Sequence, residues 1–112
     1  MTDVYISIPV ISVMEGGSFN ATAYFRLAGA ASASTTAKYR VDCLTTGKEL
    51  TDWTTLTPAV SISIPITSTH NAIQWASNRF EKKQLIVASD PDATDQTRDR
   101  VVWKVENIEN VS

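Results

Sequence analysis

Apolar and polar residues alternate along most of the chain. In the segment 19–27, alternate positions from Phe19 onward are apolar, and the positions between them are polar or amphipathic. Because successive side chains of a strand point to opposite faces, this alternation predicts a half-buried strand. The segments 37–43, 60–66, 85–87 and 101–105 repeat the pattern, and a weaker strand is expected over residues 50–56.

The first apolar segment changes its phase. Val4, Ile6 and Ile8 share one face of the predicted strand, whereas Ile11 falls on the other, and the change occurs next to Pro9. Proline cannot donate a hydrogen bond to a sheet and is confined to edges and bulges. We therefore expect an edge strand that bends at Pro9 and passes from one sheet to the other.

Turn signals separate these strands. The segment 15–18 contains two glycines, and the segment 45–48 predicts a hairpin in which Gly47 takes a positive φ. The small residues of 28–34 predict a mobile loop, and residues 68–78 lack alternation, which predicts a long loop or a short helical turn. The whole chain, residues 1–112, is thus predicted to be one all-β domain, an antiparallel β-sandwich of about seven strands.

Composition excludes several classes of protein. The chain has 112 residues and a formal net charge of -2, and 25 residues are Thr or Ser. This length suffices for a core without metals or disulfides, and the charge gives no reason to expect nucleic acid or a membrane surface as a partner. No apolar run spans a bilayer and no secretory signal is recognisable, while the lone Cys43 fits folding in a reducing compartment.

Few residues offer chemistry. His70 is the only histidine, and no nucleophile motif surrounds it, so we expect a surface-loop residue rather than a catalytic base. The carboxylates of Asp90, Asp92, Asp95 and Asp99 leave open a calcium loop, although Arg98 and Arg100 favour a solvated loop instead. We expect no cofactor, no metal and no enzymatic activity.

The aromatic and charged residues have simple structural explanations. Trp103 falls in the inward phase of its strand and is expected in the core, as is Cys43. Trp53 and Trp75 suit either a sugar-stacking surface or interface anchors. The charged run 79–83 predicts a solvated face, or charges that protect a sheet edge from aggregation.

The strand and turn motifs together resemble a known class of domain. They are the segments 39–42, 45–47, 62–65, 71–73, 85–88 and 103–105, with Leu50, Trp53 and Glu81. Over about residues 4–108 they resemble the small immunoglobulin-like or fibronectin type III-like sandwiches of tailed-bacteriophage virions. The tyrosine expected at the start of the 85–88 strand is absent, and so is the antibody pair of cysteines.

The resemblance implies a non-enzymatic structural protein. It would act as a capsid decoration, cement or tail accessory module that stabilises the assembled particle, made in the bacterial cytoplasm and located in the virion. Its implied partners are other capsid or tail proteins and further copies of itself. The alternative is a carbohydrate- or receptor-binding sandwich.

Candidate interface residues follow from both interpretations. The N-terminal strand either closes its own sandwich or pairs with a neighbouring chain by strand addition. Ile73 and Trp75 are expected to pin their loop over the end of the core. The candidates are Val4, Ile6, Ile8, Trp53, Ile73 and Trp75.

Overall fold

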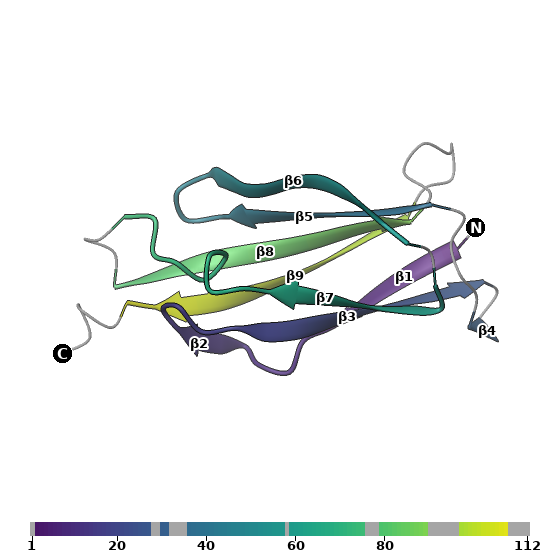
Figure 1. Cartoon of the computed structure of the whole chain (residues 1–112), viewed down its shortest axis with the longest axis horizontal. Helices are drawn as coiled ribbons and strands as arrows, with labels where there is room; N and C mark the ends of the chain where they lie inside the picture. The colour runs from purple at the N-terminus through teal and green to yellow at the C-terminus, as the bar shows by residue number, and fades with distance from the viewer. Residues whose placement is uncertain are drawn as a thin grey trace.

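The chain folds into two β-sheets that pack face to face (Figure 1). The computed structural model describes residues 2–27, 30–31, 36–57, 59–75, 79–89 and 97–107. Their strands are β1 (Thr2–Ser7), β2 (Ser12–Met14), β3 (Phe19–Leu27), β4 (Ala30–Ala31), β5 (Ala37–Cys43), β6 (Lys48–Leu56), β7 (Ser61–Ile66), β8 (Phe80–Ser89) and β9 (Thr97–Glu106). The all-β prediction is confirmed, with seven strands of six or more residues and two short ones. None of the described residues belongs to a helix able to span a membrane.

The first sheet is built around β3. This strand pairs antiparallel with β1 on one side and with β7 on the other, and β4 pairs with its last residues. Pro65 lies in β7, at the edge of the sheet, where a residue without an N–H group is tolerated. Of the predicted small-residue loop 28–34, only Ala30–Ala31 is described, as β4, and the rest lies outside the described residues.

The second sheet has the order β2-β9-β8-β5-β6 (Figure 1). The predicted hairpin joins β5 to β6, and Gly47 takes a φ of 75° there. Neighbouring strands run antiparallel except β2 and β9, which run parallel, so the prediction of a wholly antiparallel sandwich needs this one correction. The exception arises because β2 reaches this sheet from the other layer without reversing its direction.

The predicted change of sheet at Pro9 is confirmed. β1 pairs with β3 in the first sheet, and β2 pairs with β9 in the second, so the chain crosses between layers over residues 8–11. The backbone N–H of Ile6 faces away from β3 and donates to Asp99 Oδ2 of β9 at 2.8 Å. Asp99 thereby satisfies an edge donor of β1 and ties the two sheets together.

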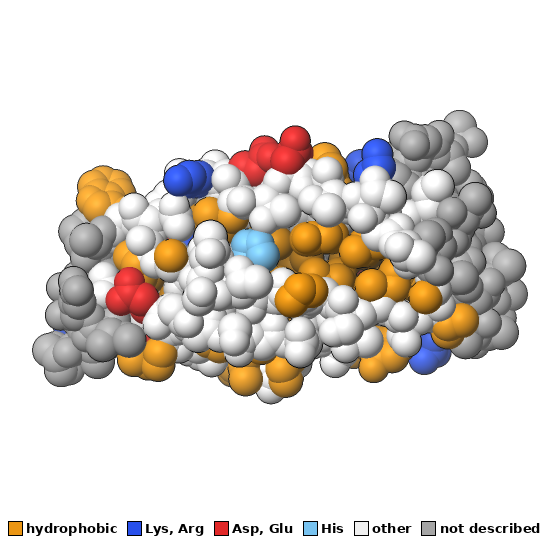
Figure 2. Space-filling view, viewed as in Figure 1, with side chains coloured by type: hydrophobic (Ala, Val, Ile, Leu, Met, Phe, Trp, Pro, Cys, Tyr) orange, Lys and Arg blue, Asp and Glu red, His pale blue; other side chains and the backbone are white. Residues whose placement is uncertain are grey.

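The core lies between the sheets and has contributions from both. Its buried apolar residues are Ile6, Ala21, Ala23, Phe25, Ala37, Val41, Ile64, Ile66, Leu85, Val87, Trp103 and Val105. Trp103 is buried as predicted, and its ring meets Phe19 edge-on with centroids 5.3 Å apart. On one side the core is less completely covered, and Figure 2 shows apolar side chains in the hollow between β6 and β7, beside His70.

Candidate functional site

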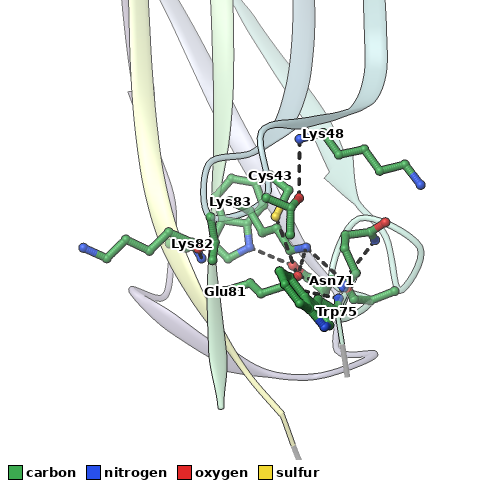
Figure 3. A network of polar contacts seen from close by, with 12 residues as sticks. Cys43, Lys48, Asn71, Trp75, Glu81, Lys82 and Lys83 are labelled. Atoms are coloured by element: carbon green, nitrogen blue, oxygen red, sulfur yellow. Dashed lines mark hydrogen bonds and ion pairs between the residues drawn. The ribbon is translucent and has the colours of Figure 1, made fainter. Parts of the chain in front are cut away.

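The segment 67–75 follows β7 at one end of the sandwich and carries the features that set this end apart. Its first residues form a tight turn, in which the backbone N–H of Asn71 donates to the carbonyl of Thr67 at 3.2 Å. The absence of alternation in the sequence had left either a loop or a helical turn open. The structure has a short turn followed by an irregular, bent stretch whose backbone polar groups bind side chains of β8 (Figure 3).

The carboxylate of Glu81 holds the end of this segment. Its Oε1 atom accepts a hydrogen bond from the backbone N–H of Gln74 at 2.8 Å, and its Oε2 atom accepts one from Trp75 at 2.9 Å. Glu81 is fully buried at the start of β8. A buried carboxylate that accepts two backbone N–H groups fixes their positions much as a capping residue does, so the backbone of Gln74 and Trp75 is anchored.

Lys83 supplies the opposite charge. Its Nζ atom lies 2.9 Å from Glu81 Oε1 and donates to the carbonyl of Ala72 at 2.9 Å, and its side chain is also fully buried. Cys43 of β5, directly opposite Lys83, donates its thiol to the same Oε1 atom at 3.6 Å. Figure 3 shows Cys43, Lys83 and Trp75 around the carboxylate of Glu81. The network therefore joins β5, β8 and the 67–75 segment.

The prediction that residues 79–83 form a solvated charged run is wrong for two of them. Glu81 and Lys83 belong to the phase of β8 that contains Leu85 and Val87, so their side chains point into the sandwich. Lys82, between them, is exposed. Extending the alternation of Leu85 and Val87 backward by two steps would have revealed the inward phase.

Asn71 connects the segment to the rest of the core. Its Oδ1 atom accepts a hydrogen bond from Trp103 Nε1 at 2.7 Å, and its Nδ2 group donates to the carbonyl of Gly17 at 2.8 Å. Its backbone carbonyl accepts from Gly16, which has a φ of 78°. Asn71 is fully buried, so the segment is fastened to both β9 and the glycine turn before β3.

His70 is not the surface-loop residue that the sequence predicted. It is buried, and its Nδ1 atom accepts a hydrogen bond from the backbone N–H of Thr67 at 3.1 Å. Because that N–H can only donate, the ring proton of the neutral form lies on Nε2, which donates to Thr51 Oγ1 at 2.8 Å. Burial lowers the pKa of His70 below its ordinary value. The residue braces the segment against β6 and is oriented by no carboxylate in the contacts described.

Ile73 and Trp75 take different positions. Ile73 is half-buried and packs against the core, as predicted. Trp75 was expected to pin the loop as well, but its side chain is 64% exposed. Glu81, Lys83 and Asn71 perform the pinning instead, and the indole is left free to meet solvent or a partner.

The other interface candidates lie elsewhere. Ile6 is buried, and the half-buried Val4 of β1 and Ile8, just after β1, pack against the core. Trp53 lies on β6, partly covered, with the guanidinium carbon of Arg98 at 5.3 Å from its ring centroid. Arg98 pairs with Ala88, near the end of β8 that lies opposite to Glu81. Trp53, which lies beside Arg98, is therefore far from Trp75, which is bound to Glu81, and the six candidates do not form one surface.

The acidic segment can be placed only in part. Asp90, Asp92 and Asp95 lie outside the described residues, so the open choice between a calcium loop and a solvated loop is not resolved by them. Asp99 is described, and its carboxylate accepts the N–H of Ile6. Among the residues described, no group of three or more His, Cys, Asp or Glu is arranged to hold a metal ion.

Further exposed apolar residues lie at the same end of the sandwich as Trp75. Phe80 immediately precedes Glu81. Glu106 of β9 pairs with Phe80 on one side and with Met14 on the other, and the backbone N–H of Leu44 donates to the carbonyl of Lys82. These three side chains are each more than 40% exposed. Together with Trp75 they form what we call the apolar end: Met14, Leu44, Trp75 and Phe80. Sequence reasoning missed Met14, Leu44 and Phe80, because nothing in a local pattern places them together.

The arrangement suits contact with another macromolecule. An indole on an anchored backbone loses little freedom on binding, and large rigid aromatic residues dominate the energetics of protein interfaces. No protein-family model matches the chain, and no curated protein matches its sequence.

Breaking the buried ion pair of Glu81 and Lys83 should lower the stability of the domain. We expect Glu81→Gln and Lys83→Met each to lower the free energy of unfolding by about 3–5 kcal/mol, because each leaves a buried charge or donor without its partner. The double variant should lose less than the sum of the two, since neither charge remains. Urea denaturation measures all three, and the neighbouring exposed Lys82→Met should change stability by less than about 0.5 kcal/mol. Strictly additive losses would contradict the pairing.

The buried neutral His70 should make stability depend on pH. Since its pKa in the folded state is lowered from 6.5, the unfolded chain binds the extra proton first as the pH falls. The free energy of unfolding therefore has its full value, as far as His70 is concerned, above pH 6.5, and it decreases as the pH falls toward the lowered pKa. Thermal unfolding of the wild type and of His70→Gln across this range should show a shallower pH slope for the variant. Identical slopes would mean that His70 is already solvated in the folded state.

Proposed function

We propose that the chain is an immunoglobulin-like or fibronectin type III-like domain. The pairing of β1, β3 and β7 in one sheet and of β9, β8, β5 and β6 in the other supports this. In the immunoglobulin fold the strands named A, B and E share a sheet, and G, F, C and C′ share the second. The crossing of the first strand from one sheet to the other is compatible with the same assignment.

We further propose that the domain is a non-enzymatic docking module. The observation that carries this is Trp75, an indole 64% exposed to solvent on a backbone that a buried carboxylate holds in place. Burying such a side chain against a partner removes a large apolar surface from water at little cost in conformational entropy. Met14, Leu44 and Phe80 add exposed apolar surface at the same end of the sandwich.

The proposed setting is a phage virion. Strand and turn motifs resemble those of virion sandwiches, and a rigid domain with one apolar end suits attachment to a capsid or tail as a decoration, cement or accessory protein. Its partners would be the shell or tail proteins at that end. The proposed location is therefore the virion, after synthesis in the bacterial cytoplasm.

A carbohydrate- or receptor-binding role is the second candidate. The exposed indole of Trp75 favours it, because the face of an aromatic ring stacks against the apolar face of a pyranose. Trp53 supports it less, since Arg98 already lies over its ring.

Replacing Trp75 should separate docking from folding. We expect the free energy of unfolding of Trp75→Ala to stay within about 0.5 kcal/mol of the wild-type value. We expect the variant to associate with purified phage particles at least about tenfold more weakly. Co-sedimentation of the tagged chain with gradient-purified particles measures this. Val60→Ala, which truncates an exposed apolar residue away from this end, is the matched control.

Two results would contradict the virion proposal. One is absence of the chain from gradient-purified particles of a phage that encodes it, by mass spectrometry. The other is a Trp75-dependent change of fluorescence with a glycan panel and no sedimentation with particles, which would favour the carbohydrate-binding candidate.

A further inference from the structure

The outer face of the first sheet carries aromatic and hydroxyl groups in rows. The side chains of β1, β3 and β7 that alternate with the buried ones point to this face. The register of the three strands places one row at Tyr5, Tyr24 and Ser61, the next at Ser7, Thr22 and Ser63, and a third at Asn20 and Pro65. None of these side chains carries a charge, so the middle of the face is neutral.

Two tyrosines form an aromatic pair at one end of these rows. Tyr5 and Tyr24 lie directly opposite each other in the register, and their ring centroids are 6.2 Å apart with 28° between the ring planes. This separation is typical of offset rings, which do not cover each other fully. Tyr5 is 60% exposed and Tyr24 is 39% exposed, so the pair presents aromatic surface to solvent. Such surface can stack against the apolar C–H face of a pyranose ring.

A cavity of about 490 Å³ lies at the other end of the rows. Asn20 and Pro65 of the third row line it, together with Ser18 just before β3 and with Thr67 and Ser68 just after β7. The ring of Pro65 provides apolar surface, and the other four side chains provide hydroxyl and amide groups. Among the described residues that line the cavity, none is charged. The cavity therefore suits a small neutral group that has both polar and apolar sides.

Most of the polar side chains on this face are available to a ligand. Within the described part of the chain, no hydrogen bond is made by the side chains of Ser7, Ser18, Asn20, Thr22, Ser61, Ser63 and Ser68. A hydroxyl group both donates and accepts hydrogen bonds, and so does a carboxamide. A neutral sugar presents the same combination, because its hydroxyl groups donate and accept around a ring with C–H faces.

We propose that the outer face of the first sheet binds a neutral glycan that lies along β3. Tyr5 and Tyr24 stack on one sugar ring, and the cavity beside Asn20 and Pro65 holds another. Four residues separate Tyr24 from Asn20, a distance of about 14 Å because an antiparallel strand rises by about 3.4 Å per residue. A monosaccharide cannot contact both ends, so the ligand is a chain of several sugars. The site shares no residue with the apolar end and does not rest on the proposed docking function.

Other ligands fit this face less well. A nucleic acid or an anionic polysaccharide is held mainly by cations, and the three rows supply none. The next position along the sheet has Asp3 opposite Arg26, where the two charges balance. A protein partner could bury the two tyrosines equally well, but it offers no regular series of hydroxyl groups to the rows of serine and threonine beside them.

Affinity electrophoresis of the full chain tests the site. The probes are dextran, mannan, xylan and hydroxyethyl cellulose as neutral polysaccharides, and alginate as an anionic one. We expect at least one neutral polysaccharide to retard the wild type, and alginate to leave its mobility unchanged. Titration calorimetry should then show that the hexasaccharide of the bound sugar binds at least about tenfold more tightly than the monosaccharide, because only the longer ligand reaches from Tyr24 to Asn20.

Substitutions locate the binding surface. Tyr24→Ala should weaken binding at least about fivefold through loss of stacking, and Asn20→Ala about threefold through loss of hydrogen bonds. Tyr24→Phe keeps the ring and should bind within about threefold of the wild type. Tyr24→Thr repeats the truncation with a residue that favours strands, and urea denaturation checks that each variant is folded. Trp75→Ala removes an exposed aromatic residue outside the site and should bind as the wild type does.

Several results would overturn the proposal. One is the absence of retardation by all four neutral polysaccharides, and another is equal affinity for the monosaccharide and the hexasaccharide. Glycan binding that Trp75→Ala abolishes and Tyr24→Ala leaves intact would assign the sugar to the apolar end instead. Self-association that Tyr24→Ala abolishes, without glycan binding, would assign the face to a second copy of the chain. Association with particles is scored separately, so failure of the glycan site and failure of docking are distinguishable.

Discussion

The ion pair of Glu81 and Lys83 is the interaction on which this end of the molecule depends. Both side chains are fully removed from water, which is costly unless every charge finds partners. Those partners come from the 67–75 segment: two backbone N–H groups for the carboxylate and one carbonyl for the ammonium. The segment cannot leave its place without exposing an unsatisfied pair in the core, so its conformation is coupled to global folding.

That coupling explains how an exposed residue can be rigid. The side chain of Trp75 is exposed, yet its backbone is held by Glu81 and its segment by Asn71 and His70. A docking residue presented in this way differs from one on a mobile loop, because binding need not order the chain.

Local patterns predicted much of the fold. Alternation located the long strands, Pro9 marked the crossing between sheets, and Gly47 marked the hairpin, because each of these depends on the backbone of its own segment. The partners of Glu81 could not be predicted in this way. Its charge predicted a solvent-exposed side chain, and only the fold reveals that Lys83, Cys43 and the backbone N–H groups of residues 74–75 bind it.

The candidate site was predicted in part for the same reason. Trp75 was among the expected interface residues, but its exposure follows from contacts made by other residues of its segment. The prediction of a surface position for His70 is wrong because nothing in its neighbouring sequence indicates that Thr51, in a different strand, faces it. Pairings between elements carry no local signature, and here they decide both what is buried and what is presented.

Amide hydrogen exchange of Gln74 and Trp75 tests the central claim most directly. If the buried carboxylate of Glu81 holds these two N–H groups, their exchange should be as slow as that of core amides of β8 and should report global unfolding. Exchange of both amides at the rate of an unstructured peptide, while β8 stays protected, would contradict the account.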